Sequence, residues 1–179
     1  GALQQAGVDG WLFADFRGSD PLAYRVLKLS NAGMLSRRWY YYLPATGDPR
    51  KLVHRIESHS LDILPGRLVQ YASWQELHAQ LKSVLGDGRR IAMQYSPRNA
   101  IPYISRVDAG TIELVRSFGI ELVSSADLVQ RFEAVWTPEQ WESHQYAARC
   151  LRTIVNEAFS HIRETVTNRG EIGEHTVQQ

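Results

Sequence analysis

The sequence predicts an α/β fold in which a mixed β-sheet is flanked by helices and followed by a long C-terminal helix. Short apolar runs rich in strand-forming residues alternate with amphipathic, helix-like segments, a pattern typical of helices packed on a sheet. Two strand-like runs flank the turn signal Thr-Gly-Asp-Pro at residues 46–49, so one pair of strands should be antiparallel. A final amphipathic segment, after residue 137, is far longer than the others and predicts the C-terminal helix.

The composition is that of an ordinary globular chain. Its 179 residues are 44% hydrophobic and 22% charged, which fits one domain or one domain and part of another. The formal net charge of +1 creates no field that would attract nucleic acid, and no apolar run approaches the roughly 20 residues of a membrane span. The one cysteine, Cys150, excludes an intrachain disulfide and fits a reducing compartment. We therefore expect a cytoplasmic protein without a nucleic-acid or membrane partner.

The first part of the chain leads into a hairpin at residues 37–57. We expect, in order, a short helix at residues 3–6, a buried strand at residues 8–15 and a helix with Pro21 in its first turn, capped by Ser19 or Asp20.

The first strand of the hairpin carries large side chains on both faces. Trp39, Tyr41 and Leu43 should face one side of the sheet, and Tyr40 and Tyr42 the other, because side chains alternate along a strand. This pattern indicates a central strand that is covered above and below.

The second strand of the hairpin places a histidine among apolar neighbours. We expect Leu52, His54 and Ile56 to share one face of it. Arg37 and Arg38 would then lie at the open end of the same hairpin.

After the hairpin, strands and helices continue to alternate. We expect a strand at residues 67–72, a helix that begins with a capping box of Ser73 and Glu76, a strand at residues 91–95, a helix capped by Asp108, a strand at residues 120–123, and a helix that begins at Ser124 or Ser125.

The character of the chain changes near residue 135. Thr-Pro-Glu-Gln at residues 137–140 is a strong helix start, and the helix should continue to about Val166, roughly 40 Å at 1.5 Å per residue. We therefore divide the chain into an α/β domain at residues 1–135 and, at residues 136–179, a linker and the first helical part of another domain. The chain begins without methionine and ends in polar residues at helical spacing, so we expect a fragment.

No motif in the chain predicts catalytic chemistry of its own. The six histidines form no His-Glu-x-x-His or comparable metal motif, and no serine stands in a nucleophile elbow. Cys150 lies beside the apolar stripe of the long helix, so we interpret it as a small buried hydrophobe. Asp108 is better explained as a helix cap than as part of a phosphate-binding turn. We expect neither catalytic residues nor metal ligands here.

The open end of the hairpin is the one candidate for a binding role. Arg37, Arg38, Trp39 and His54 are candidates for substrate access or for a subunit interface, since arginine pairs recognise carboxylates. The simpler alternative is a solvated or salt-bridged role for the arginines and a structural role for the histidine. Stacking of the aromatic residues on single-stranded nucleic acid is a weaker interpretation than packing in the core.

Four stretches carry a resemblance to a known family. Ser-Arg-Arg-Trp-Tyr at residues 36–40, Leu-Val-His-Arg-Ile-Glu at 52–57, the stretch at 101–111 and the stretch at 124–130 resemble the N-terminal domain of the pita-bread metallopeptidases. This family includes Xaa-Pro dipeptidase (prolidase), aminopeptidase P and creatinase. Gly-Glu-Ile-Gly-Glu at residues 170–174 is similar to the start of the second helix of their catalytic domain.

The resemblance implies a non-catalytic domain with a mixed sheet of the creatinase/prolidase type, which contributes to substrate access and oligomerisation. Implied partners are its own catalytic domain, a second subunit in a homodimer, and proline-containing peptides. Two divalent metals (Mn, Co or Zn) on two aspartates, one histidine and two glutamates are implied downstream of Gln179, where a metal-activated water would attack the Xaa-Pro bond. Two alternatives stay open: a peptide- or protein-binding domain of a pseudo-enzyme, and the N-terminal domain of a creatinase-like amidinohydrolase.

Overall fold

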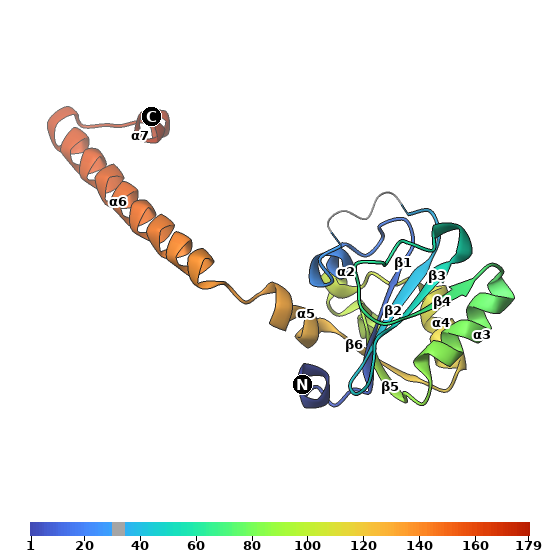
Figure 1. The fold of residues 1–179 in the computed structure, drawn as a ribbon. Helices are drawn as coiled ribbons and strands as arrows, with labels where there is room; N and C mark the ends of the chain where they lie inside the picture. The colour runs from blue at the N-terminus through green and yellow to red at the C-terminus, as the bar shows by residue number, and fades with distance from the viewer. Residues whose placement is uncertain (30–34) are drawn as a thin grey trace. The chain divides into compact units, whose positions relative to one another are not determined.

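The computed structural model describes residues 1–29 and 35–179. The chain divides into two compact units, Gly1–Ala134 and Val135–Gln179, and each is described here by itself (Figure 1). The first unit is an α/β sandwich and the second is helical.

The first unit is built on a six-stranded sheet with the order β4-β3-β2-β1-β5-β6. Its strands are β1 Gly10–Asp15, β2 Trp39–Pro44, β3 Arg50–His54, β4 Arg67–Tyr71, β5 Arg90–Met93 and β6 Glu121–Ser124. The strand β2 is antiparallel to both of its neighbours, and the other pairs are parallel. The predicted mixed sheet is therefore confirmed, and β2 begins at the edge where the other five strands end.

Helices cover both faces of this sheet. The α-helices of the first unit are α1 Ala2–Gln5, α2 Pro21–Val26, α3 Trp74–Leu85, α4 Ala109–Ser117 and α5 Ala126–Glu133. Three short 3₁₀ turns, η1 Arg55–Glu57, η2 Pro97–Asn99 and η3 Pro102–Ile104, follow β3 and β5. The second unit contains α6 Pro138–Arg169 and α7 Glu174–Gln178.

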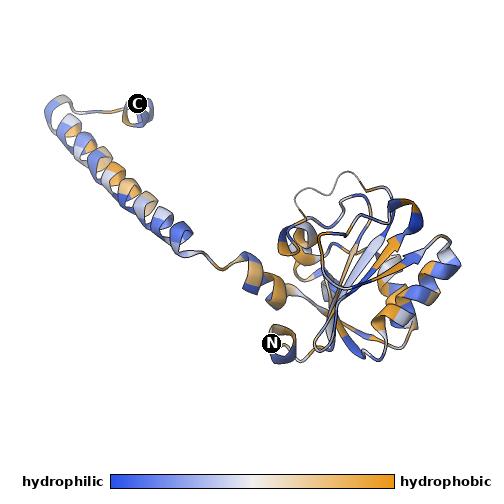
Figure 2. Ribbon diagram, in the orientation of Figure 1, coloured by the Kyte–Doolittle hydropathy of each residue, from blue (hydrophilic) through white to orange (hydrophobic). Residues whose placement is uncertain are grey.

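The aromatic strand β2 divides the core into two layers, as its alternation predicts. Tyr40 and Tyr42 pack with side chains of α3 and α4 on one face, whereas Trp39 and Tyr41 pack with α2 and α5 on the other. The helix α3 carries both hydrophobic and hydrophilic residues, as an amphipathic helix on a sheet should (Figure 2).

The hairpin is confirmed, but one of its residues was placed wrongly. Tyr40 pairs with Leu52 and Tyr42 with Arg50, and the turn between them contains Gly47 at a φ of +94°. Ile56 does not share a strand face with His54: it lies in η1 and is 73% exposed. The strand stops at His54 because its ring Nδ1 accepts the Ile56 amide at 3.1 Å and turns the chain.

The predicted helix starts are found, with one difference. Asp20, Ser73 and Asp108 each accept a main-chain N–H in the first turn of their helix. The carboxylate of Glu76, however, accepts the Ala72 amide at 2.8 Å, not the amide of the cap residue as in a capping box.

The second unit begins with a complete capping motif. Thr137 and Gln140 form a reciprocal capping box, and Trp136 lies 5.7 Å from Trp141 between ring centroids. These tryptophans occupy the positions before the cap and four residues into the helix, the arrangement of a hydrophobic staple. The helix runs three residues beyond the predicted end. Cys150 is half-buried on it, so it is less enclosed within this unit than the sequence suggested.

Candidate functional site at the carboxyl edge of the sheet

The topology brings functional side chains to one edge of the sheet. We call it the carboxyl edge: the edge where β1, β3, β4, β5 and β6 end and β2 begins. In open α/β sheets, ligands bind outside the carboxyl ends of the strands. Arg37 and Arg38, which precede β2, and His54, which ends β3, all lie at this edge.

The main chain at the two arginines is fixed, while their guanidinium groups are exposed. The carboxylate of Glu57 accepts the amides of Ser36 at 2.9 Å and Arg37 at 3.0 Å. The carbonyl of Arg38 accepts the hydroxyl of Tyr71 at 2.7 Å. Desolvation raises the pKa of Glu57, but the hydrogen bonds from Ser36 and Arg37 outweigh it and keep that pKa below its usual value. The open end of the hairpin is therefore held by an ionised carboxylate.

The other two candidates from the sequence have different surroundings. Trp39 is 1% exposed and packs edge-on against Tyr24 at 5.9 Å, so its ring contributes to the core. His54 is half-buried, its Nε2 lies 3.3 Å from the carbonyl oxygen of Ala72, and its ring meets Tyr71 at 5.0 Å. Because Nδ1 accepts an amide, the hydrogen bonds assign the ring proton to Nε2. Tyr71 thus connects His54 to the main chain of Arg38.

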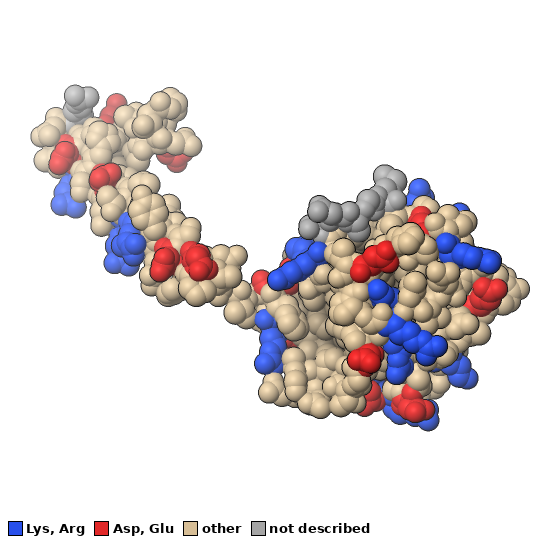
Figure 3. All heavy atoms as spheres, viewed as in Figure 1, with Lys and Arg blue, Asp and Glu red and all other residues tan. Residues whose placement is uncertain are grey.

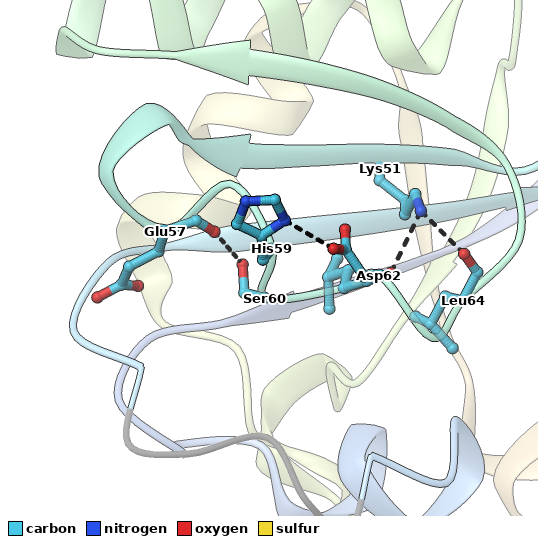
Figure 4. Close-up of polar contacts among 7 residues, drawn as sticks. Lys51, Glu57, His59, Ser60, Asp62 and Leu64 are labelled. Atoms are coloured by element: carbon cyan, nitrogen blue, oxygen red, sulfur yellow. Dashed lines mark hydrogen bonds and ion pairs between the residues drawn. The ribbon is translucent and has the colours of Figure 1, made fainter.

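A buried lysine anchors the loop between β3 and β4. Lys51 is 7% exposed, and its ammonium group donates to the carbonyls of Leu61 at 3.3 Å and Leu64 at 2.9 Å (Figure 4). The exposed imidazole of His59 pairs with Asp62 at 2.7 Å in the same loop. These bonds pair polar groups within the loop, so Lys51, His59 and Asp62 have a structural role there.

The loop after β1 is organised by one carboxylate that the sequence did not single out. The buried Asp15 accepts from the amides of Gly18 and Asp20, at 3.0 and 2.9 Å, and from the hydroxyls of Ser19 and Tyr24, at 3.4 and 3.1 Å. Only the position of an aspartate at the end of a strand hinted at this role.

A second carboxyl group, Asp20, is fully buried beside the first. One oxygen accepts the Ala23 amide at 3.1 Å, whereas Oδ2 has no hydrogen-bond partner among the described residues. Desolvation raises the pKa of Asp20 to about 6, against an opposing contribution from the bond to Ala23. Near neutral pH the fold therefore holds a poorly solvated charge at this helix cap.

Beside these groups the carboxyl edge contains a small polar cavity. It is lined by Asp15, Arg38, Tyr40, Arg106, Asp108 and Thr111, among others, and its volume of about 20 Å³ suits one ordered water. The carboxylate of Asp108 accepts both the amide and the hydroxyl of Thr111. The cavity is too small for a substrate, so any ligand would have to lie over its mouth.

The arginine side chains at the carboxyl edge can donate hydrogen bonds to the acceptor groups of a ligand. The described residues form three ion pairs: Arg25–Glu133, His59–Asp62 and Arg90–Glu121. The guanidinium groups of Arg38 and Arg106 take part in none of these pairs. On the face that Figure 3 shows, basic and acidic side chains are interspersed over the α/β unit. The site is thus a rim of exposed arginines and not a strongly charged field.

The described residues do not fit a metal centre or a membrane span. In residues 1–29 and 35–179 no three histidine, cysteine, aspartate or glutamate side chains come together as a metal site would require. Within the same ranges, no helix has the length and apolar character to cross a bilayer.

Comparison with solved structures defines the fold class. No protein-family model matches the chain, and no curated protein matches its sequence. Among solved structures, the match to the creatinase/prolidase N-terminal domain of an X-Pro dipeptidase from Streptococcus pyogenes covers 72% of this chain and 91% of that one, at a TM-score of 0.51 and 13% identity. The first unit therefore has the fold of a creatinase/prolidase N-terminal domain.

Individual dipeptidase structures match the chain with different coverage. A dipeptidase from Pyrococcus horikoshii matches 90% of this chain at a TM-score of 0.57 and 17% identity, but only 41% of its own chain is covered. A proline dipeptidase structure from Streptococcus pneumoniae is covered over 93% of its length by 75% of this chain, at a TM-score of 0.54 and 15% identity. The chain also matches a prolidase from Pyrococcus horikoshii, of which it spans 41%.

Proposed function

We propose that this chain is the non-catalytic N-terminal domain of a Xaa-Pro peptidase, together with the start of its catalytic domain. One observation carries the proposal. The chain matches the Pyrococcus dipeptidase over 90% of its own length but covers only 41% of that protein, and it covers 91% of the creatinase/prolidase N-terminal domain from Streptococcus pyogenes. In this proposal Gly1–Ala134 supplies substrate access and oligomer contacts, and α6 belongs to the catalytic domain.

The carboxyl edge is suited to guiding a substrate and not to hydrolysing it. Arg37 and Arg38 present charged groups from a backbone that Glu57 and Tyr71 fix, which limits the entropy lost when a carboxylate is bound. The dinuclear metal centre belongs to the downstream part of the parent protein. There the metals would activate water for attack on the peptide carbonyl.

Peptidase assays of the chain and of its full-length parent test the proposal. The purified chain of 179 residues should show no turnover of Xaa-Pro dipeptides with Mn, Co or Zn added, while the full-length parent hydrolyses them. Hydrolysis by the purified chain at the rate of an intact prolidase would contradict the proposal.

The downstream sequence of the parent separates the remaining alternatives. If two aspartates, one histidine and two glutamates stand at the family's ligand positions, the parent is a hydrolase. Loss of these ligands would favour a pseudo-enzyme that binds peptides or proteins. Profiling the intact enzyme with creatine and with Xaa-Pro dipeptides then distinguishes an amidinohydrolase from a peptidase.

Substitutions at the rim test whether it contacts substrate. In the full-length enzyme, Arg37→Gln and Arg38→Gln should each raise KM severalfold and leave the melting temperature unchanged, because both side chains are exposed. His54→Gln should also raise KM, with a lower melting temperature, because the half-buried ring accepts the Ile56 amide and packs on Tyr71. Arg89→Gln is the matched control, since Arg89 is exposed at the opposite edge of the sheet, before β5. An unchanged KM with a lowered melting temperature would assign the three residues to structure.

A further inference from the structure

The edge strand β4 has main-chain groups that nothing in the described chain uses. It is the last strand of the sheet and pairs only with β3. The amide of Arg67 points inward, because it donates to Pro49 O at 2.9 Å. In a parallel ladder alternate residues point inward, so Arg67, Val69 and Tyr71 face β3, whereas the amides and carbonyls of Leu68 and Gln70 point outward.

The outward side of β4 carries few of the features that block further pairing. Among the described residues, no main-chain hydrogen bond outside the ladder reaches Leu68 or Gln70. The strand has no proline, its register with β3 is continuous from Arg67 to Tyr71, and Leu68 is 41% exposed. Charges, prolines and bulges are the usual protections of an edge, and Arg67 is the one charged residue here.

At the other end of the sheet, β6 is the weaker candidate. It has four residues, and its first, Glu121, is in an ion pair with Arg90. We propose that β4 pairs antiparallel with β4 of a second copy of this chain, about a two-fold axis through Val69. This pairing rests on the proposed function only in that oligomer contacts are expected of this domain.

The hydrogen-bond pattern of β4 fits this axis. Leu68 of one copy lies opposite Gln70 of the other, and these are the residues with outward groups, so both pairs exchange two hydrogen bonds each. The two Val69 residues then form the non-hydrogen-bonded pair between them, with Cα atoms roughly 4.5 Å apart.

The side chains of β4 are compatible with self-pairing. Arg67 of one copy is opposite Tyr71 of the other, so no like charges face each other directly. Antiparallel pairing about an axis makes the contact isologous and closes it at two copies.

A cysteine pair in the same strand tests the proposed axis. In a Cys150→Ser background, Val69→Cys places one cysteine on the axis, within the Cα distances that disulfides allow. Leu68→Cys is the matched control, because the two Leu68 Cα atoms would be separated diagonally by roughly 7–8 Å. Under mild oxidation, the Val69→Cys chain should form covalent dimers roughly tenfold faster than the Leu68→Cys chain on a non-reducing gel.

Equal rates for the two cysteines, or a faster reaction at position 68, would overturn the proposal, as would absence of dimers from both. That result would leave the proposed function standing, because peptidase assays of the parent test it separately.

Gln70→Pro supplies a second measurement on the non-covalent dimer. Proline at this position removes an outward N–H without touching the ladder to β3, a position that edge strands tolerate. The dimer measured by analytical ultracentrifugation should dissociate at lower protein concentration, with the circular dichroism spectrum unchanged. A folded Gln70→Pro chain with undiminished self-association would contradict pairing through β4.

Discussion

Asp20 is a carboxyl group that the fold buries at the start of α2. Because its folded pKa of about 6 exceeds the usual value of 3.8, the folded state holds the proton more tightly than the unfolded state. Protonation therefore stabilises the fold. The free energy of unfolding should rise as pH falls from above 6 toward 4, by about 3 kcal/mol at most for a two-unit shift.

Replacing this carboxyl tests the assignment. Asp20→Asn keeps an N-cap oxygen for the Ala23 amide but removes the titration, so urea unfolding of the variant should lose the pH dependence between 4 and 7. Asp48→Asn, in the exposed hairpin turn, is the matched control and should show the same pH dependence as the unsubstituted chain. If Asp20→Asn showed the same pH profile of stability as the unsubstituted chain, another group would cause the pH dependence.

Lys51 holds the loop between β3 and β4 through two main-chain carbonyls. Lys51→Met preserves the bulk of the side chain but leaves the carbonyls of Leu61 and Leu64 without their donor, which should destabilise the fold by about 1–3 kcal/mol. Urea unfolding measures the loss. The matched Lys82→Met, at an exposed position of α3, should change stability by less than about 0.5 kcal/mol. Similar values for both variants would show that the carbonyls find water instead.

At the scale of elements, two threonine-to-alanine substitutions in α6 should change the stability of the helix in opposite directions. Thr137→Ala removes the hydroxyl that accepts the Gln140 amide at 3.2 Å and should weaken the first turn by about 1 kcal/mol. Thr153→Ala, in the exposed interior of the same helix, should strengthen it by a few tenths of a kcal/mol because alanine has the higher helix propensity. Hydrogen exchange of the amides in α6 reports both effects, and equal protection losses would argue against the cap.

Elements with a local signal could be predicted from the sequence, and contacts between distant elements could not. The alternating aromatic residues of β2 identify a central strand, and the caps Asp20, Ser73 and Asp108 lie next to the helices they begin. The end of β3 at His54 depends on a ring that accepts an amide two residues later, which strand propensity does not encode.

The candidate site was only partly predictable for the same reason. Arg37, Arg38 and His54 reach one edge because β2 runs against its neighbours, and the hairpin signal implied that much. The contact from Tyr71 to Arg38 joins residues 33 positions apart, and no periodicity predicts it. Trp39 was grouped with the rim because of its sequence neighbours, although strand alternation turns its ring into the core.

At the scale of the whole molecule, the two units should unfold in separate transitions. A chain that ends at Ala134 should fold with the sheet and both core layers intact, because both buried clusters consist of residues of Gly1–Ala134. Its urea midpoint, followed by tryptophan fluorescence, should agree with that of the α/β transition in the 179-residue chain. Failure of residues 1–134 to fold would show that the helical unit is needed to complete the core.

The parallel pairing of β1 with β5 has a consequence for synthesis on the ribosome. The strands β1, β2 and β3 pair in chain order, through a hairpin between β2 and β3 and a longer connection with α2 between β1 and β2. The free side of β1 is covered only when Ile91 arrives opposite Gly10, about eighty residues later. During that interval the growing chain leaves main-chain groups of β1 unpaired on this side, an edge that can pair with another chain.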